Sequence, residues 1–82
     1  MTITTLNSTY TLEDMGDGTF LMSGTNSTYF PGPLRVEVSK PPTVGECFWI
    51  KFLDGPRVGT WIHTSLVREV HYENELDYPQ VI

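Results

Sequence analysis

Glycine and proline interrupt this chain at short intervals, and this punctuation most constrains how it folds. Seven Gly and six Pro occur among the 82 residues, which include no Ala and one Gln, so a helical bundle is disfavoured. Between these interruptions, apolar and polar side chains alternate with a period of two, as in a strand with one buried face. Such segments follow one another at about ten-residue spacing. The sequence therefore predicts a small all-β domain of five or six antiparallel strands.

The clearest strand lies at Leu34–Ser39, where Leu34, Val36 and Val38 share one face. In a second segment, Phe48, Ile50 and Phe52 face one way, while Trp49 lies on the opposite face. In chain order, we expect strands at Tyr10–Met15, Thr19–Ser23, Leu34–Ser39, Cys47–Leu53, Thr60–His63 and Val67–His71. We expect a hairpin turn at Gly16–Gly18, a loop at Gly24–Pro33, a turn at Asp54–Gly59 and a tight turn at Thr64–Leu66.

Charge divides the chain into a domain, residues 1–71, and a tail, residues 72–82. The net charge is −5, and the tail contains three acidic side chains and no basic one. A chain without a basic surface is not expected to bind nucleic acid directly.

No apolar run approaches the roughly 18 residues needed to span a bilayer, and no export signal is visible at the start. We therefore expect a cytoplasmic protein that does not associate with membranes.

The order of elements after Pro42 resembles the second half of SH3-like barrels, in which a tight hairpin and one 3₁₀ turn precede the closing strand. The run Gly59–Val67 carries most of this resemblance. It implies a small SH3-like barrel followed by the short acidic tail. Eukaryotic SH3 domains line a groove for Pro-rich peptides with aromatic residues, and His63–Leu66 lacks them here, so that activity is not expected. In style, the chain is also similar to small acidic β proteins of bacteriophages and mobile elements, several of which inhibit host defence.

Aromatic side chains are the main candidates for a binding surface. Trp49 and Trp61 both fall opposite the apolar face of their strands, where they are able to pair across a hairpin. Two interpretations stay open: the two rings form a second core layer or a surface covered by the tail, or they form an exposed aromatic platform for a partner. Our first hypothesis is a non-enzymatic module that binds a protein, self-associates and occludes a host protein if it is phage-encoded, in which case it acts in the host cytoplasm. Its apolar anchors are Trp49, Trp61, Tyr29 and Phe30, and the tail residues Glu73, Glu75 and Asp77 meet a basic groove.

Two other hypotheses follow from the same residues. In the first, an oligomer holds a small anionic, nucleotide-like ligand, stacking its base on Trp61 or Trp49 and binding its phosphates with Arg57 or Arg35. In the second, the protein is a structural subunit whose tail reaches a neighbouring subunit.

The sequence contains no convincing site for catalysis, metal or cofactor. His63, His71 and the single Cys47 lack the spacing of a zinc site, and no cation near Cys47 in the sequence would activate its thiol. Gly16–Gly18 lacks the following Lys and helix that make a glycine loop a phosphate cradle. We therefore expect no enzymatic activity and no cofactor.

Overall fold

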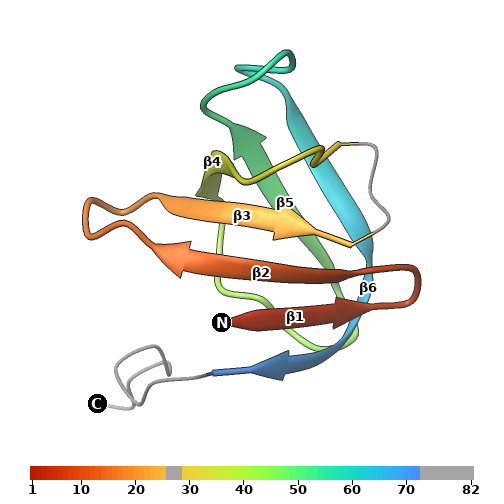
Figure 1. Ribbon diagram of the computed structural model, residues 1–82. Helices are drawn as coiled ribbons and strands as arrows, with labels where there is room; N and C mark the ends of the chain where they lie inside the picture. Colours follow the sequence, from red (N-terminus) through yellow and green to blue (C-terminus); the bar gives the residue numbers. More distant parts are fainter. Residues whose placement is uncertain (26–28, 73–82) are drawn as a thin grey trace.

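Six antiparallel strands form a closed barrel in the computed structural model, which describes residues 1–25 and 29–72. Each strand pairs with the next, and the last strand pairs with the first, as Figure 1 shows. The strands are β1 (Thr2–Thr5), β2 (Thr9–Asp14), β3 (Phe20–Gly24), β4 (Leu34–Val38), β5 (Cys47–Phe52) and β6 (Trp61–His71). The prediction of a small all-β barrel is confirmed, and the architecture is compatible with an SH3-like barrel.

The β2–β3 hairpin turns at Gly16–Gly18, as the sequence predicts. Gly16 and Gly18 have φ angles of 84° and 87°, a conformation in which a side chain is strained. Between them, Oδ1 of Asp17 accepts hydrogen bonds from the backbone N–H of Thr19 at 3.0 Å and from its hydroxyl at 2.5 Å. The two glycines and this carboxylate together fix the turn.

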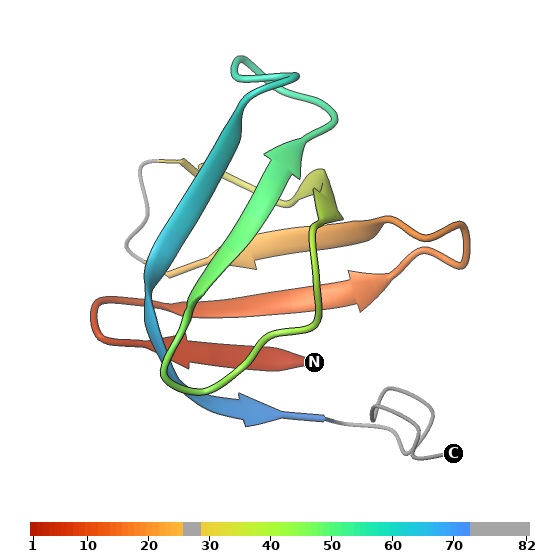
Figure 2. The same ribbon diagram turned by 180° about the vertical axis from the view of Figure 1, so that it is seen from behind.

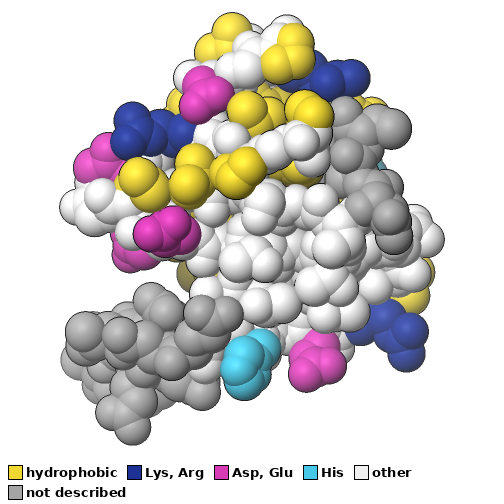
Figure 3. Space-filling view, in the orientation of Figure 1, with side chains coloured by type: hydrophobic (Ala, Val, Ile, Leu, Met, Phe, Trp, Pro, Cys, Tyr) yellow, Lys and Arg dark blue, Asp and Glu magenta, His cyan; other side chains and the backbone are white. Residues whose placement is uncertain are grey.

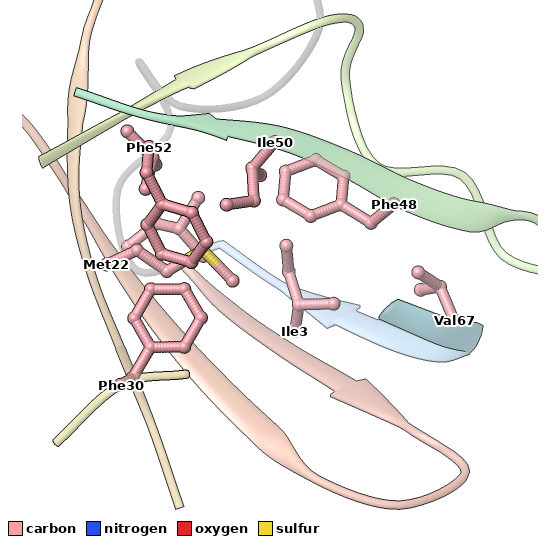
Figure 4. Close-up of a cluster of buried hydrophobic side chains, with 9 residues drawn as sticks. Ile3, Met22, Phe30, Phe48, Ile50, Phe52 and Val67 are labelled. Atoms are coloured by element: carbon pink, nitrogen blue, oxygen red, sulfur yellow. The ribbon is translucent and has the colours of Figure 1, made fainter. Parts of the chain in front are cut away.

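The barrel encloses one hydrophobic core, to which all six strands and the loop before β4 contribute. Phe48, Ile50 and Phe52 point inward from β5, as the alternation predicts. Figure 4 shows how the core side chains converge from opposite walls of the barrel. The buried hydrophobic residues are Ile3, Leu12, Met22, Phe30, Val36, Phe48, Ile50, Phe52 and Val67.

The first strand, β1, is a finding that the sequence did not predict. Its side chains alternate in burial, with Ile3 and Thr5 facing the core. Because three of its four residues are Thr, the apolar alternation is too weak to identify a strand. The buried Thr5 hydroxyl donates to the carbonyl oxygen of Ser8 at 3.1 Å and accepts from the Ser8 N–H at 3.2 Å. Thr5 therefore buries a polar group with its hydrogen bonds satisfied.

The tight turn expected at Thr64–Leu66 is wrong, because β6 runs unbroken through these residues. The inward-facing residues of β6 are Ile62, Thr64, Val67 and Val70, so the period of two is interrupted twice. Pairing with β5 shifts register between Cys47 and Trp49, and pairing with β1 shifts between Thr4 and Thr5. These irregularities have the character of β-bulges, which bend a strand without ending it. The alternation of apolar and polar residues does shift along this part of the sequence. A bulge within one continuous strand accommodates the shift, so no turn is needed.

Candidate binding surface

The outer face of the β5–β6 hairpin exposes three large apolar side chains. In the strand register, Trp49 lies opposite His63, Lys51 opposite Trp61, and Cys47 opposite Leu66. Trp49, Trp61 and Leu66 are 43%, 44% and 45% exposed, although the opposite side of β5 lies in the core. The two strands run side by side in Figure 2. We call these six residues, Cys47, Trp49, Lys51, Trp61, His63 and Leu66, the outer ladder.

Trp49 is held on this face by His63 rather than by Trp61. The two rings lie 4.7 Å apart between centroids, with an angle of 45° between their planes. Nδ1 of His63 lies 3.0 Å from the carbonyl oxygen of Thr64, so this nitrogen carries the hydrogen and donates it. The expectation that Trp49 and Trp61 pair directly is corrected, because the register makes them diagonal neighbours.

Tyr29, on the loop before β4, is a further exposed aromatic residue and lines the same pocket as His63. Its ring is 43% exposed, and the Arg57 guanidinium carbon lies 4.7 Å from the ring centroid, within cation–π distance. Arg57 belongs to the turn between β5 and β6, so this contact ties the loop to the hairpin. In Figure 3, hydrophobic and basic side chains gather at the end of the molecule where this hairpin turns.

Phe30 does not belong to this surface, which corrects its assignment as an exposed anchor. Its side chain is 4% exposed and packs against Phe52 at 5.4 Å and Tyr10 at 5.9 Å between ring centroids. Figure 4 shows Phe30 facing Phe52 across the core. Burying this ring recovers apolar surface that the loop would otherwise expose. Phe30 therefore anchors the loop to the barrel, while its neighbour Tyr29 faces outward.

Within one chain, the residues of the small-ligand hypothesis do not lie together; the hypothesis places the ligand in an oligomer, which a single chain does not test. Arg57 contacts Tyr29 instead of a Trp ring, and Arg35 lies on β4, which is separated from Trp61 on β6 by β5. The backbone N–H of Arg35 donates to Oδ2 of Asp54 at 3.4 Å. The acidic residues assigned to partner binding, Glu73, Glu75 and Asp77, lie outside the described residues.

A pocket of about 220 Å³ with a mixed polar and apolar lining, which we call the His63 pocket, lies beside the outer ladder. Its lining residues come from the β1–β2 turn, the loop at Tyr29 and β6, with one residue each from β2, β3 and β5. Nδ2 of Asn7 donates to Oγ of Ser65 at 3.0 Å across it. None of Trp61, Arg57 and Arg35 lines this pocket.

Over residues 1–25 and 29–72, no cluster of three or more His, Cys, Asp or Glu side chains is arranged to hold a metal ion. The same residues include no helix of the length and apolarity that crossing a membrane requires.

The exposed pair Lys40–Glu46, with 3.1 Å between Nζ and Oε1, lies on the loop leading into β5.

Sequence reasoning missed Leu66 as a surface residue because it assigned this residue to a turn. His63 was identifiable, since it alternates on the same side of the chain as Trp61.

Comparison with known proteins gives no match to any family model, curated protein or solved structure.

Proposed function

We propose that this protein is a non-enzymatic protein-binding module, and that the outer ladder is its contact surface. The observation that supports this proposal is the exposure of both Trp side chains and Leu66 on one face of a single hairpin. Trp is strongly enriched among the residues that dominate binding energy at protein interfaces. An apolar face of this kind is costly to leave in water and gains free energy when a partner covers it.

The fold gives this surface a fixed shape before any partner arrives. β5 pairs with β4 on one side and β6 on the other, so its outer side chains project from a backbone bonded along both edges. Trp49 is further restrained by the ring of His63. A surface ordered in the free protein loses less conformational entropy on binding, which favours affinity.

Tyr29 and Arg57 supply the adjoining part of the proposed surface. The exposed guanidinium of Arg57, which lies over the Tyr29 ring, offers hydrogen-bond donors beside the apolar ladder, as in the polar rim of an interface. The proposed roles of Glu73, Glu75 and Asp77 toward a basic partner remain predictions from the sequence. The same holds for self-association, for inhibition of a host protein and for residence in the cytoplasm.

Comparative affinity capture from lysates of the source cells tests the proposal. The tagged proteins are the wild type, the double variant Trp49→Ala/Trp61→Ala, and the control Met15→Ala. Met15 is 39% exposed but follows β2, away from the outer ladder. Loss of one hot-spot side chain costs about 2 kcal/mol or more, so we expect the double variant to lose well over tenfold in retained partner. Equal retention by all three proteins, each shown to be folded, contradicts the proposal.

A further inference from the structure

A larger and more apolar pocket, of about 350 Å³, opens at the other end of β1 from the His63 pocket. Its apolar lining consists of Met1, Phe20, Val38, Pro41, Pro42 and Tyr72. Met1, Phe20 and Val38 are partly buried and pack directly against the core. This pocket, which we call the end pocket, is therefore a place where the second layer of the core is left uncovered.

The chain leaves the barrel at the wall of the end pocket. His71, the last residue of β6, pairs with Thr2, and the next residue, Tyr72, lines the pocket. Figure 1 shows the N-terminus and the end of β6 on the same side of the barrel. Ten residues follow Tyr72 in the sequence. At about 3.3 Å per residue, Leu76 reaches up to about 13 Å from Tyr72 and Tyr78 up to about 20 Å, which is enough to return to the pocket.

The chemistry of residues 73–82 matches that of the end pocket. Leu76 and Tyr78 alternate with Glu75 and Asp77, so an extended segment presents its apolar side chains on one face and its carboxylates on the other. The segment has three acidic side chains and no basic one, whereas the pocket lining includes Lys40 and no acidic residue. The Lys40 ammonium also pairs with Glu46, outside the lining, at 3.1 Å. An apolar face and opposite charge thus occur together in a segment that is tethered at the pocket.

We propose that residues 73–82 dock in the end pocket of their own barrel. Leu76 and Tyr78 cover Phe20, Val38 and Pro42, and the carboxylates face solvent on the side of Lys40. Because the segment is attached to the pocket wall, its effective concentration there is high, and a modest affinity suffices to keep the pocket filled. The outer ladder contributes no residue to the end pocket, so this inference does not depend on the proposed function.

Amide chemical shifts of the ¹⁵N-labelled full-length protein test the docking. The test variant is Leu76→Ser/Tyr78→Ser, and the matched control is Asn74→Ser/Gln80→Ser, which changes polar residues of the same segment. We expect the amides of Phe20, Val38 and Lys40 to shift in the test variant and to keep their positions in the control. If the test variant leaves these amides unmoved, the segment does not occupy the pocket and the proposal is wrong.

A spin label decides whether the docked segment comes from the same chain. Cys47 is the only cysteine, so a label on Gln80→Cys in a Cys47→Ser background is unique. We expect the labelled ¹⁵N protein to show broadened amides at Phe20 and Val38. A mixture of unlabelled ¹⁵N protein with spin-labelled ¹⁴N protein should show no broadening. Equal broadening in the mixture identifies a second copy as the donor, and an absence of broadening in both samples shows an empty pocket; either result overturns the proposal.

Discussion

The rings of Trp49 and His63 lie against each other across the β5–β6 hairpin, with 4.7 Å between their centroids. This contact explains how an indole that is 43% exposed keeps a defined position on the outer face of the barrel. Contacts between directly opposed side chains are the main source of side-chain stabilisation in antiparallel pairs. The pair stabilises the hairpin while leaving much of the Trp49 ring accessible to a partner.

We expect Trp49 and His63 to be energetically coupled. In a double-mutant cycle with Trp49→Ala and His63→Ala, the coupling free energy should be about 0.5–1.5 kcal/mol, as for other aromatic pairs. Urea unfolding followed by circular dichroism measures it. A cycle that combines Trp49→Ala with Met15→Ala, on a different hairpin, should give additive effects. Additivity in both cycles is inconsistent with a stabilising ring contact.

Phe30→Ala and Tyr29→Ala should have very different effects on stability, although the residues are adjacent. Phe30 is buried against Phe52 and Tyr10, so its truncation should lower the free energy of unfolding by about 3–5 kcal/mol. Tyr29→Ala removes a half-exposed ring and its contact with Arg57, and should cost about 1 kcal/mol or less. Thermal unfolding of both variants provides the comparison. Similar losses in both would show that Phe30 is not a core residue.

The Thr64 hydroxyl should be required for the stability of the bulged part of β6. Thr64 is 6% exposed, and its Oγ1 accepts from the Phe48 N–H at 3.1 Å and donates to the Ser65 carbonyl oxygen at 2.7 Å. Thr64→Val preserves the shape but leaves the buried Phe48 N–H without this partner, at an expected cost of about 1–3 kcal/mol. Denaturant unfolding should show this loss. The same change at exposed Thr60 should stay within about 0.5 kcal/mol of the wild type.

The stability contributed by Asp17 should disappear in acid. The hydrogen bond from the Thr19 hydroxyl, together with that from the Thr19 N–H, lowers the pKa of Asp17 below its ordinary value of 3.8. A carboxyl whose pKa is lower in the folded state stabilises the fold above the unfolded pKa and loses this effect as pH falls through the folded pKa. The difference in unfolding free energy between wild type and Asp17→Asn should therefore be constant at neutral pH and shrink below about pH 3.8. A difference that does not change with pH would contradict the stabilising role of the charge.

Alternating hydrophobicity was sufficient to predict most of the barrel. Leu34–Ser39 and Cys47–Leu53 each have one apolar face, and the structure buries that face in both strands. The sequence did not predict the strand at Thr2–Thr5, because Thr occurs at both buried and exposed positions. Only the hydrogen bonds of the buried Thr distinguish the two cases, and these are visible only in the structure. Thr64–Leu66 was assigned to a turn because turns and bulges both interrupt the alternation of apolar and polar residues, and the sequence alone does not tell them apart.

The candidate surface was only partly predictable, because it depends on register. Alternation placed Trp49 and Trp61 on the outer side, and both are exposed in the structure. Which side chain lies opposite Trp49 depends on the geometry of the β5–β6 turn and on the register shift between Cys47 and Trp49, which local sequence does not specify. The opposite fates of Tyr29 and Phe30 depend on where the loop meets the core, which is a tertiary property.

Acrylamide quenching of tryptophan fluorescence tests the outer ladder most directly, because Trp49 and Trp61 are the only two Trp residues in the chain. Trp49→Phe and Trp61→Phe variants assign the signal to each ring. In the free protein, both rings should be quenched readily. In the complex with the partner captured by the wild type, both should be protected and their emission should shift to shorter wavelength. Unchanged quenching of both rings in the complex would show that the partner binds elsewhere and would contradict the account.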